Sequence, residues 1–460
     1  MGPISDQRGV EQGGPNSSEH YKIYNNEQMT SAQTSGFGAF IKDVQIAAIG
    51  QADDTALVST DINELQHLLQ LSLDYCAKYQ VELSEVKTKL LVFSASDSDY
   101  TKYAKLITPV HIGSQKVPFV DNAEHVGVMR SVAGNLPHLH KRMANHRKAL
   151  NGLLFAGMSR KHRANPLSSI RADKIFGSPV LFSGLASLIL TKSEIEILNS
   201  HVKDILQGLL KLYPKTPDPV IYFISGSMPG EALLHLKQLT LFGAVTRLPG
   251  NIMHTVAKDT LMTASDNDTS WYGQIRNLCF QYHLPNPLTL LHQPPSQKKY
   301  KSLIKNNIAQ FWQEKLRAMI HRGEHNELTS LKFFKPEYMS LLRPHPILAT
   351  AAHSYDVNKM VIQLRMLSGR YRVGSLLRHF SPEHSGTCEL CGVELEDISH
   401  VLVPRCSALQ ERRSLLIDYA FGILEQSPVS HAIFENILNF TKEEQDGDLF
   451  YSVQLEILVF

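Results

Sequence analysis

The stretch from Ile49 to Val58, which reads Ile-Gly-Gln-Ala-Asp-Asp-Thr-Ala-Leu-Val, places two adjacent carboxylates between two apolar runs. Such runs with a short polar break predict a tight β-hairpin whose tip carries Asp53 and Asp54. Neighbouring carboxylates repel each other, so a divalent cation is the simplest reason to hold both at one apex. The stretch therefore predicts a Mg²⁺ site suited to two-metal phosphoryl transfer, with a solvated acidic turn as the common alternative.

A glycine-rich turn precedes this hairpin and a charged loop follows it. The turn contains Gln12-Gly13-Gly14-Pro15, where glycine lets a nucleotide or a template base approach the backbone. The loop Lys87-Thr88-Lys89 leads into Leu90–Phe93, which predicts a strand. Between the hairpin and this loop, apolar residues at helical spacing predict a helix over residues 63–79 with Asp61 as its cap.

These three segments, in this order, resemble the palm of reverse transcriptases encoded by non-LTR (LINE-like) retrotransposons. The resemblance implies an RNA-directed DNA polymerase by descent. An RNA template, a DNA primer or target and dNTPs would be its partners, and Mg²⁺ or Mn²⁺ its cofactor. The residues it assigns to the template and nucleotide are Gln12, Gly13, Gly14 and Pro15. The catalytic residues it assigns are Asp53 and Asp54, which bind metal, and Lys87, a cation near the triphosphate.

The chain departs from the family at two points. Gln51 stands where the family has an aromatic residue, and the family's third metal-binding aspartate lies on a strand upstream of the glycine turn. The sequence begins only a few residues before that turn, so we expect an incomplete palm that holds its metals weakly. The alternative function is a catalytically inactive remnant that binds nucleic acid through its helical region and a zinc knuckle.

A second motif lies toward the other end of the chain. Cys388, Cys391, His400 and Cys406 form a C-x2-C-x8-H-x5-C pattern, a Cys₃His set that predicts a tetrahedral Zn²⁺ site. The alternative is a group of unrelated cysteines in a reduced protein. The segment also resembles the cysteine–histidine tail of the same retrotransposon proteins. The positions that carry this likeness are His400-Val401-Leu402, Cys406 and Arg412, preceded by Leu364–Arg372.

A basic segment runs from His138 to Lys148 and is followed by Arg160–Arg163. On a helix, these cations could follow a phosphate backbone. The residues that we expect to contact nucleic acid are Lys141, Arg142, Arg147 and Lys148. The alternative is a solvated helix face above a buried stripe formed by Leu139, Met143, Leu150 and Leu153.

Composition limits the location of the protein. The 460 residues are 43% hydrophobic with a formal net charge of +2, which is too mild to establish nucleic-acid binding. The N-terminus has no apolar leader, and Pro179–Leu190 is too short to span a membrane and predicts a buried helix. Cys76 and Cys279 stand alone in apolar contexts. We expect an intracellular protein, nuclear or cytoplasmic, that is neither secreted nor membrane-bound.

The predicted fold class is α+β. A partial polymerase palm of antiparallel strands and helices precedes a mainly α-helical thumb-like and C-terminal region with a small zinc knuckle. Residues 1–35 are polar and are expected to be poorly ordered. A hairpin is expected across Val110–Val117, a strand at His125–Val128, helix breaks at Tyr213–Pro219 and Pro285–Pro295, and a core position for Trp312. The predicted domains are 1–130 (incomplete palm), 131–290 (helical thumb-like region), 291–380 (helical C-terminal region), 381–415 (zinc-knuckle-like segment) and 416–460 (C-terminal helical tail).

Overall fold

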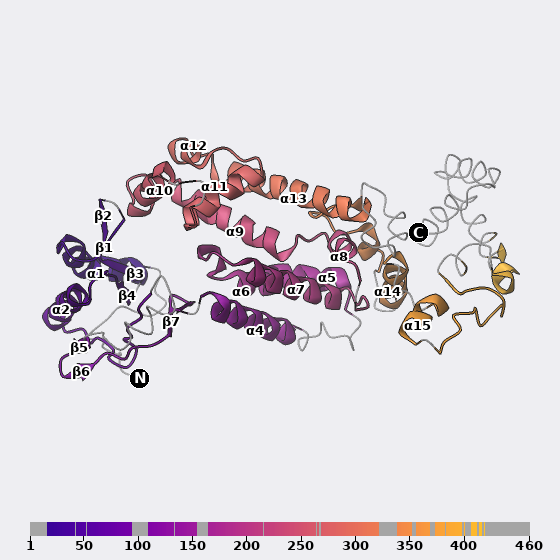
Figure 1. Ribbon diagram of the computed structural model, residues 1–460, viewed down its shortest axis with the longest axis horizontal. Coiled ribbons are helices and arrows are strands. Elements are labelled where there is room, and N and C mark those ends of the chain that lie inside the picture. The colour runs from indigo at the N-terminus through magenta and orange to yellow at the C-terminus, as the bar shows by residue number, and fades with distance from the viewer. Residues whose placement is uncertain are drawn as a thin grey trace, which may run out of the picture. The chain divides into compact units, whose positions relative to one another are not determined.

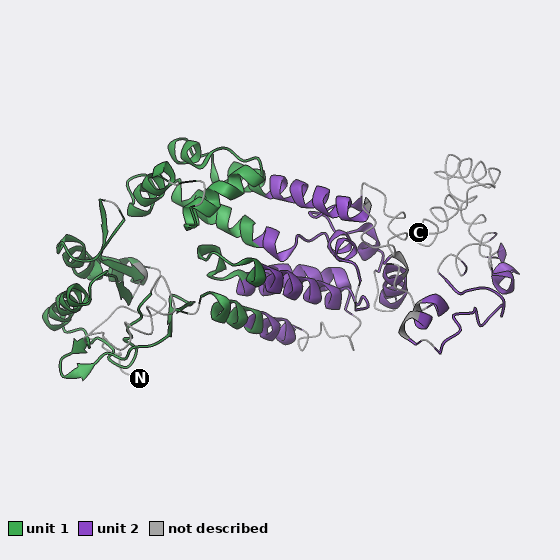
Figure 2. Ribbon diagram, viewed as in Figure 1, with its two compact units in different colours: residues 1–144, 182–194, 234–304 green, residues 145–181, 195–233, 305–460 purple. Residues whose placement is uncertain are grey.

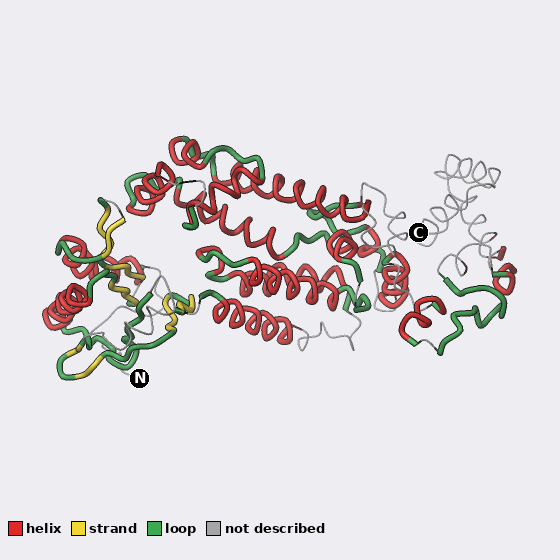
Figure 3. Tube along the Cα trace, in the orientation of Figure 1, coloured by secondary structure: helices red, strands yellow, loops and turns green. Residues whose placement is uncertain are grey.

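The computed structural model shows a mixed chain in which helices predominate over small antiparallel sheets (Figure 3). The predicted α+β class is therefore confirmed at this level. The residues that the structure describes are 16–41, 43–51, 53–93, 109–132, 134–153, 164–214, 216–263, 265, 268–321, 338–351, 356–368, 373–381, 383–397, 400, 406–411, 414–415 and 418.

Each sheet in the described part of the chain is a two-stranded hairpin. The pairs are β1 (Ala39–Ile41) with β2 (Val44–Ile46), β3 (Ala48–Gln51) with β4 (Asp54–Leu57), β5 (His111–Ile112) with β6 (Gln115–Lys116), and β7 (Asn122–His125) with β8 (Val128–Ser131).

Helix α1 precedes the hairpins, α2 lies between β4 and β5, and the other helices follow β8 (Figure 1). Their bounds are α1 (Ser17–Thr34), α2 (Ile62–Tyr79), α4 (Leu136–Leu153), α5 (Pro166–Ala172), α6 (Ser178–Phe182), α7 (Lys192–Leu209), α8 (Asp218–Ser225), α9 (Gly230–Val245), α10 (Ile252–Thr263), α11 (Trp271–Gln281), α12 (Pro287–His292), α13 (Gln297–His321), α14 (Asp356–Leu367) and α15 (Gly374–Phe380). A π-helical turn spans Asp173–Gly177, and short 3₁₀ turns span Leu185–Ser187, Pro346–Ala349 and Ser407–Leu409.

The chain divides into two compact units, each assembled from three segments (Figure 2). The first unit contains Met1–Ala144, Phe182–Glu194 and Leu234–Ile304. The second contains Asn145–Leu181, Ile195–Leu233 and Lys305–Phe460. The predicted domain boundaries, and the names palm and thumb, remain predictions.

In the first unit, α1 and α2 pack around the first two hairpins. Ala32, Ala47 and Leu68 form one buried cluster there. A second cluster joins α2 to the β5–β6 hairpin through Leu69, Leu90, Val110, Ile112 and Val117. Helix α2 matches its prediction, and the Asp61 carboxylate accepts the N–H groups of Asn63 and Glu64 as an N-cap.

The expectation of poor order at the N-terminus is wrong for residues 17–34. This polar segment forms α1, because Asn25, Gln28 and Ala32 recur on one face at helical spacing and are buried. Tyr75 on α2 also donates a hydrogen bond to the carbonyl of Tyr24, at 2.8 Å. Tertiary packing therefore orders a helix that composition alone did not favour.

Two predicted strands are corrected and one hairpin is confirmed. In place of a strand at Leu90–Phe93, the structure has a single parallel bridge between Leu90 and Phe119. The segment His125–Val128 is a hairpin turn, because Val126 and Gly127 both have positive φ (51° and 72°), as a type I′ turn requires. The hairpin expected across residues 110–117 is present as β5–β6.

The apolar segment Pro179–Leu190 is not one buried helix. Gly184 adopts a left-handed conformation (φ 77°), which ends α6 and starts the 3₁₀ turn. The proline cluster at residues 213–219 separates α7 from α8, as predicted, and Trp312 is buried on α13. Among the described residues, no helix is long and apolar enough to cross a membrane.

Candidate metal centre

The four predicted zinc ligands come together in the second unit. One candidate ligand atom from each of Cys388, Cys391, His400 and Cys406 lies within 4.8 Å of every other. The Sγ atoms of Cys388 and Cys406 are 3.9 Å apart, and Cys391 Sγ is 3.4 Å from His400 Nε2. A tetrahedral zinc ion with bonds of about 2.0–2.3 Å separates its ligand atoms by similar distances. The geometry therefore fits one zinc ion.

A short backbone turn positions the first two cysteines. The N–H of Cys388 donates to the carbonyl of Glu394, and the N–H of Gly392 donates to the carbonyl of Cys388, both at 2.8 Å. Gly392 follows Cys391 with φ 71°, a conformation that glycine adopts without strain. This geometry directs both thiols to the same side of the turn.

Carboxylates orient the histidine of the cluster. Glu394 Oε2 lies 2.9 Å from Nδ1 of His400, which leaves Nε2 facing the thiols. The backbone N–H of His400 also donates to the Asp397 carboxylate. Because a histidine that donates Nδ1–H has its lone pair on Nε2, this contact selects the tautomer that binds a metal.

The electrostatics of the turn favour a thiolate at Cys391. Hydrogen bonds from the backbone N–H groups of Glu394 and Val393 lower the pKa of Cys391 to about 6. The thiolate is the form that binds zinc. Of the likeness in this segment, Val401, Leu402 and Arg412 lie outside the described residues, as does the end of the preceding stretch from residue 369 to 372.

Comparison with known proteins adds no relative. No model of a known protein family matches the chain. None of the curated proteins matches it at a significant level.

The acidic hairpin has the predicted form. Gln51 pairs with Asp54 across the turn, so both aspartates stand at the tip, and both are exposed. The tip lies near α1, to which Tyr21 and Met29 belong. Burial and the charge of Asp53 raise the pKa of Tyr21, and Gly50 lies against the sulfur of Met29. The hairpin therefore offers two carboxylates to solvent.

No contact in the described part of the chain brings the other residues expected at the polymerase site to this tip. Lys87 is exposed in a turn closed by a hydrogen bond from its N–H to the carbonyl of Ser84. Within the described part of the chain, no hydrogen bond or ion pair joins Lys87 to either aspartate. Gln12, Gly13, Gly14 and Pro15 lie outside the described residues.

The basic helix needs a correction. His138 and His146, counted among its cations, are buried, and burial lowers the pKa of His138. Lys141 pairs with Glu124, and Arg142 donates to the carbonyl of Gly127, so both stabilise the β7–β8 hairpin against α4. Arg147 and Lys148 are exposed. Leu139, Met143 and Leu150 are buried and Leu153 is half-buried, which fits the stripe of the alternative interpretation. The later cluster, residues 160–163, lies outside the described part.

Sequence reasoning missed a buried chain of three polar groups in the second unit. Nε2 of His146 lies 2.7 Å from Oδ1 of Asp173, and Nδ1 of His146 lies 2.9 Å from Nε2 of His201. The available signal was the place of His146 in the apolar stripe of α4, three residues after Met143 and four before Leu150.

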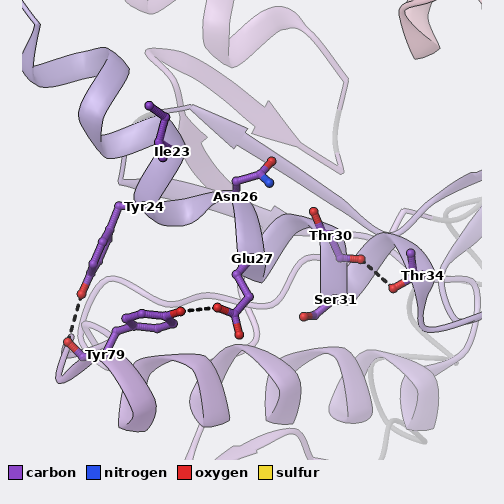
Figure 4. A pocket seen from close by; sticks show the side chains of 8 residues that line it. All are labelled: Ile23, Tyr24, Asn26, Glu27, Thr30, Ser31, Thr34 and Tyr79. Atoms are coloured by element: carbon purple, nitrogen blue, oxygen red, sulfur yellow. Dashed lines mark hydrogen bonds between the residues drawn. The ribbon is translucent and has the colours of Figure 1, made fainter.

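A shallow hollow of about 450 Å³ lies along α1 at the end of α2 (Figure 4). Tyr79 donates to the carboxylate of Glu27, and Tyr24 donates to the carbonyl of Tyr79. None of the predicted site residues lines it. Its hydrogen bonds hold the two helices together.

Proposed function

We propose that this chain is a nucleic-acid-binding protein of reverse-transcriptase descent whose C-terminal segment is organised by one zinc ion. The observation that carries the proposal is the convergence of Cys388, Cys391, His400 and Cys406 within 4.8 Å. Small zinc knuckles are recurrent RNA-binding modules, because the metal fixes a short loop whose exposed side chains contact unpaired bases. The loop has such side chains in Leu390 and Val393, which are 63% and 82% exposed.

The descent rests on the ordered likeness of three N-terminal segments and the C-terminal knuckle to one family. The β3–β4 hairpin is compatible with it, because that family carries its metal-binding aspartates on a strand–turn–strand. A second candidate function follows from the same hairpin, namely Mg²⁺-dependent nucleotidyl transfer at Asp53 and Asp54. In the described residues neither aspartate forms an ion pair, so both carboxylates can accept a cation.

The first experiment measures zinc content and RNA binding of the purified protein beside Cys391→Ser. We expect one zinc per chain, its loss in the variant and weaker RNA binding by the variant. Ser407→Ala is the matched control, because Ser407 is exposed next to Cys406 and its change should alter neither property. A metal-free wild-type protein that binds RNA normally would exclude the zinc-organised form of the proposal.

The second experiment is primer extension on an RNA template with Mg²⁺ and then Mn²⁺, beside an Asp53→Asn, Asp54→Asn variant. Extension that disappears in the variant would support the polymerase. A folded wild-type protein that binds the template and extends no primer would leave nucleic-acid binding alone.

A further inference from the structure

The π-helical turn Asp173–Gly177 is fixed from its inner side. Asp173 bonds His146, which bonds His201, and these groups are buried. Gly177 packs directly on them, since a Cβ there would lie 2.3 Å from Asp173 Oδ1 and 2.8 Å from His146 Nε2. The turn is therefore held by a polar interior contact on one side and by close packing at its end.

The outer side of the same turn exposes large apolar side chains. Ile175 and Phe176 are 63% and 57% exposed. A π-helical turn is a rare distortion of a helix and is found often at functional sites. Here the distortion coincides with two adjacent apolar residues that contribute little to the core.

Lys174, the residue before this apolar pair, is a cation with a second cation near it. Lys174 donates from Nζ to the carbonyl of Gly226 at 3.0 Å, and burial and the neighbouring charge of Lys305 lower the pKa of Lys174. The carboxylate that acts on Lys174 is Asp173, and it is already bonded to His146. An anion between Lys174 and Lys305 would relieve the repulsion of the two cations.

We propose that Lys174, Ile175, Phe176 and Lys305 form a surface, here called the π-turn surface, that binds single-stranded nucleic acid. Phosphates contact the cations and a base stacks on Phe176. Positive charge beside an exposed aromatic ring fits a single strand, because an unpaired base offers a π-face to the ring and its phosphate offers the charge. This inference rests on the proposed nucleic-acid function and names the part of the second unit that performs it.

The test is fluorescence anisotropy of labelled oligouridylate and oligodeoxythymidylate with the full chain over a series of salt concentrations. Phe176→Ala should weaken binding about tenfold, the loss of one stacked base. Phe280→Ala is the matched control, because Phe280 is 87% exposed in the first unit and its change should leave binding unaltered. A duplex competitor should bind the wild-type chain more weakly than the single strand.

Lys305→Gln provides an independent test on an exposed helical position. It should reduce the slope of log affinity against log salt by about 0.7, the value for one phosphate contact on a single strand. If the wild-type chain binds oligonucleotides while Phe176→Ala and Lys305→Gln bind with wild-type affinity and slope, the π-turn surface does not contact nucleic acid and this inference is overturned. If the wild-type chain binds no oligonucleotide, the proposed function fails with it.

Discussion

Glu394 Oε2 lies 2.9 Å from Nδ1 of His400. The carboxylate is more than half exposed, whereas the histidine is buried among the three cysteines. Through this contact the exposed carboxylate of Glu394 orients the imidazole of His400 for metal binding.

Replacing Glu394 by alanine should lower zinc affinity about 10- to 100-fold, because His400 loses the partner that fixes its tautomer and ring orientation. Competition with a chromophoric chelator measures this affinity. Glu389→Ala changes an exposed carboxylate on the same turn and serves as control. Equal affinities for the two variants would mean that Glu394 does not position the histidine.

Removing the metal should unfold the turn while the rest of the chain stays folded. The N–H groups of Cys388, Gly392 and Glu396 donate within this turn, and we expect their hydrogen exchange to accelerate strongly in the presence of a chelator. Amides of α2 are the internal reference and should keep their protection. Unchanged protection in the turn would show that its fold does not depend on metal.

Acid should destabilise the second unit through two buried histidines. Burial lowers the pKa of both His201 and His345 to about 4, below the ordinary value of 6.5. Between these values the unfolded chain binds more protons than the folded one, so the free energy of unfolding falls as pH falls from 6.5 toward 4. Each histidine contributes a slope of up to about 1.4 kcal/mol per pH unit.

Urea unfolding across this pH range measures the slope. His201→Gln should make it shallower, because the substituted side chain does not titrate. His292→Gln, at an exposed position at the end of α12, should leave it unchanged. A slope that is the same in His201→Gln and in the wild-type chain would exclude His201 as its source.

Two glycines of the second unit should respond oppositely to alanine. Gly177→Ala should destabilise the protein by about 1–3 kcal/mol, because the new methyl group would overlap the Asp173–His146 pair. Gly152→Ala places its methyl group in open space on α4 and should stabilise by about 0.5–1 kcal/mol. Thermal unfolding of both variants separates the two effects. A neutral Gly177→Ala would contradict the close packing of the π-helical turn.

Local sequence determined the elements whose contacts are close along the chain. The acidic hairpin follows from apolar runs around a short polar break, and the cap of α2 follows from Asp61 just before an apolar helical repeat. The Cys₃His cluster was predicted from spacing, because its ligands fall within a short loop. In each case the interacting groups lie close together along the chain.

Tertiary structure alone decided the rest. The order of α1 depends on packing against α2, and the burial of His146 depends on Asp173 and His201, which are 27 and 55 residues away in the chain. The sequence predicted that Lys141 and Arg142 are free to bind nucleic acid. In the structure Lys141 pairs with Glu124 and Arg142 donates to the carbonyl of Gly127, both in the β7–β8 hairpin. The sequence pattern records the polarity of a side chain and its periodicity, whereas its partner and its charge state are set by groups that only the folded chain brings within hydrogen-bonding distance.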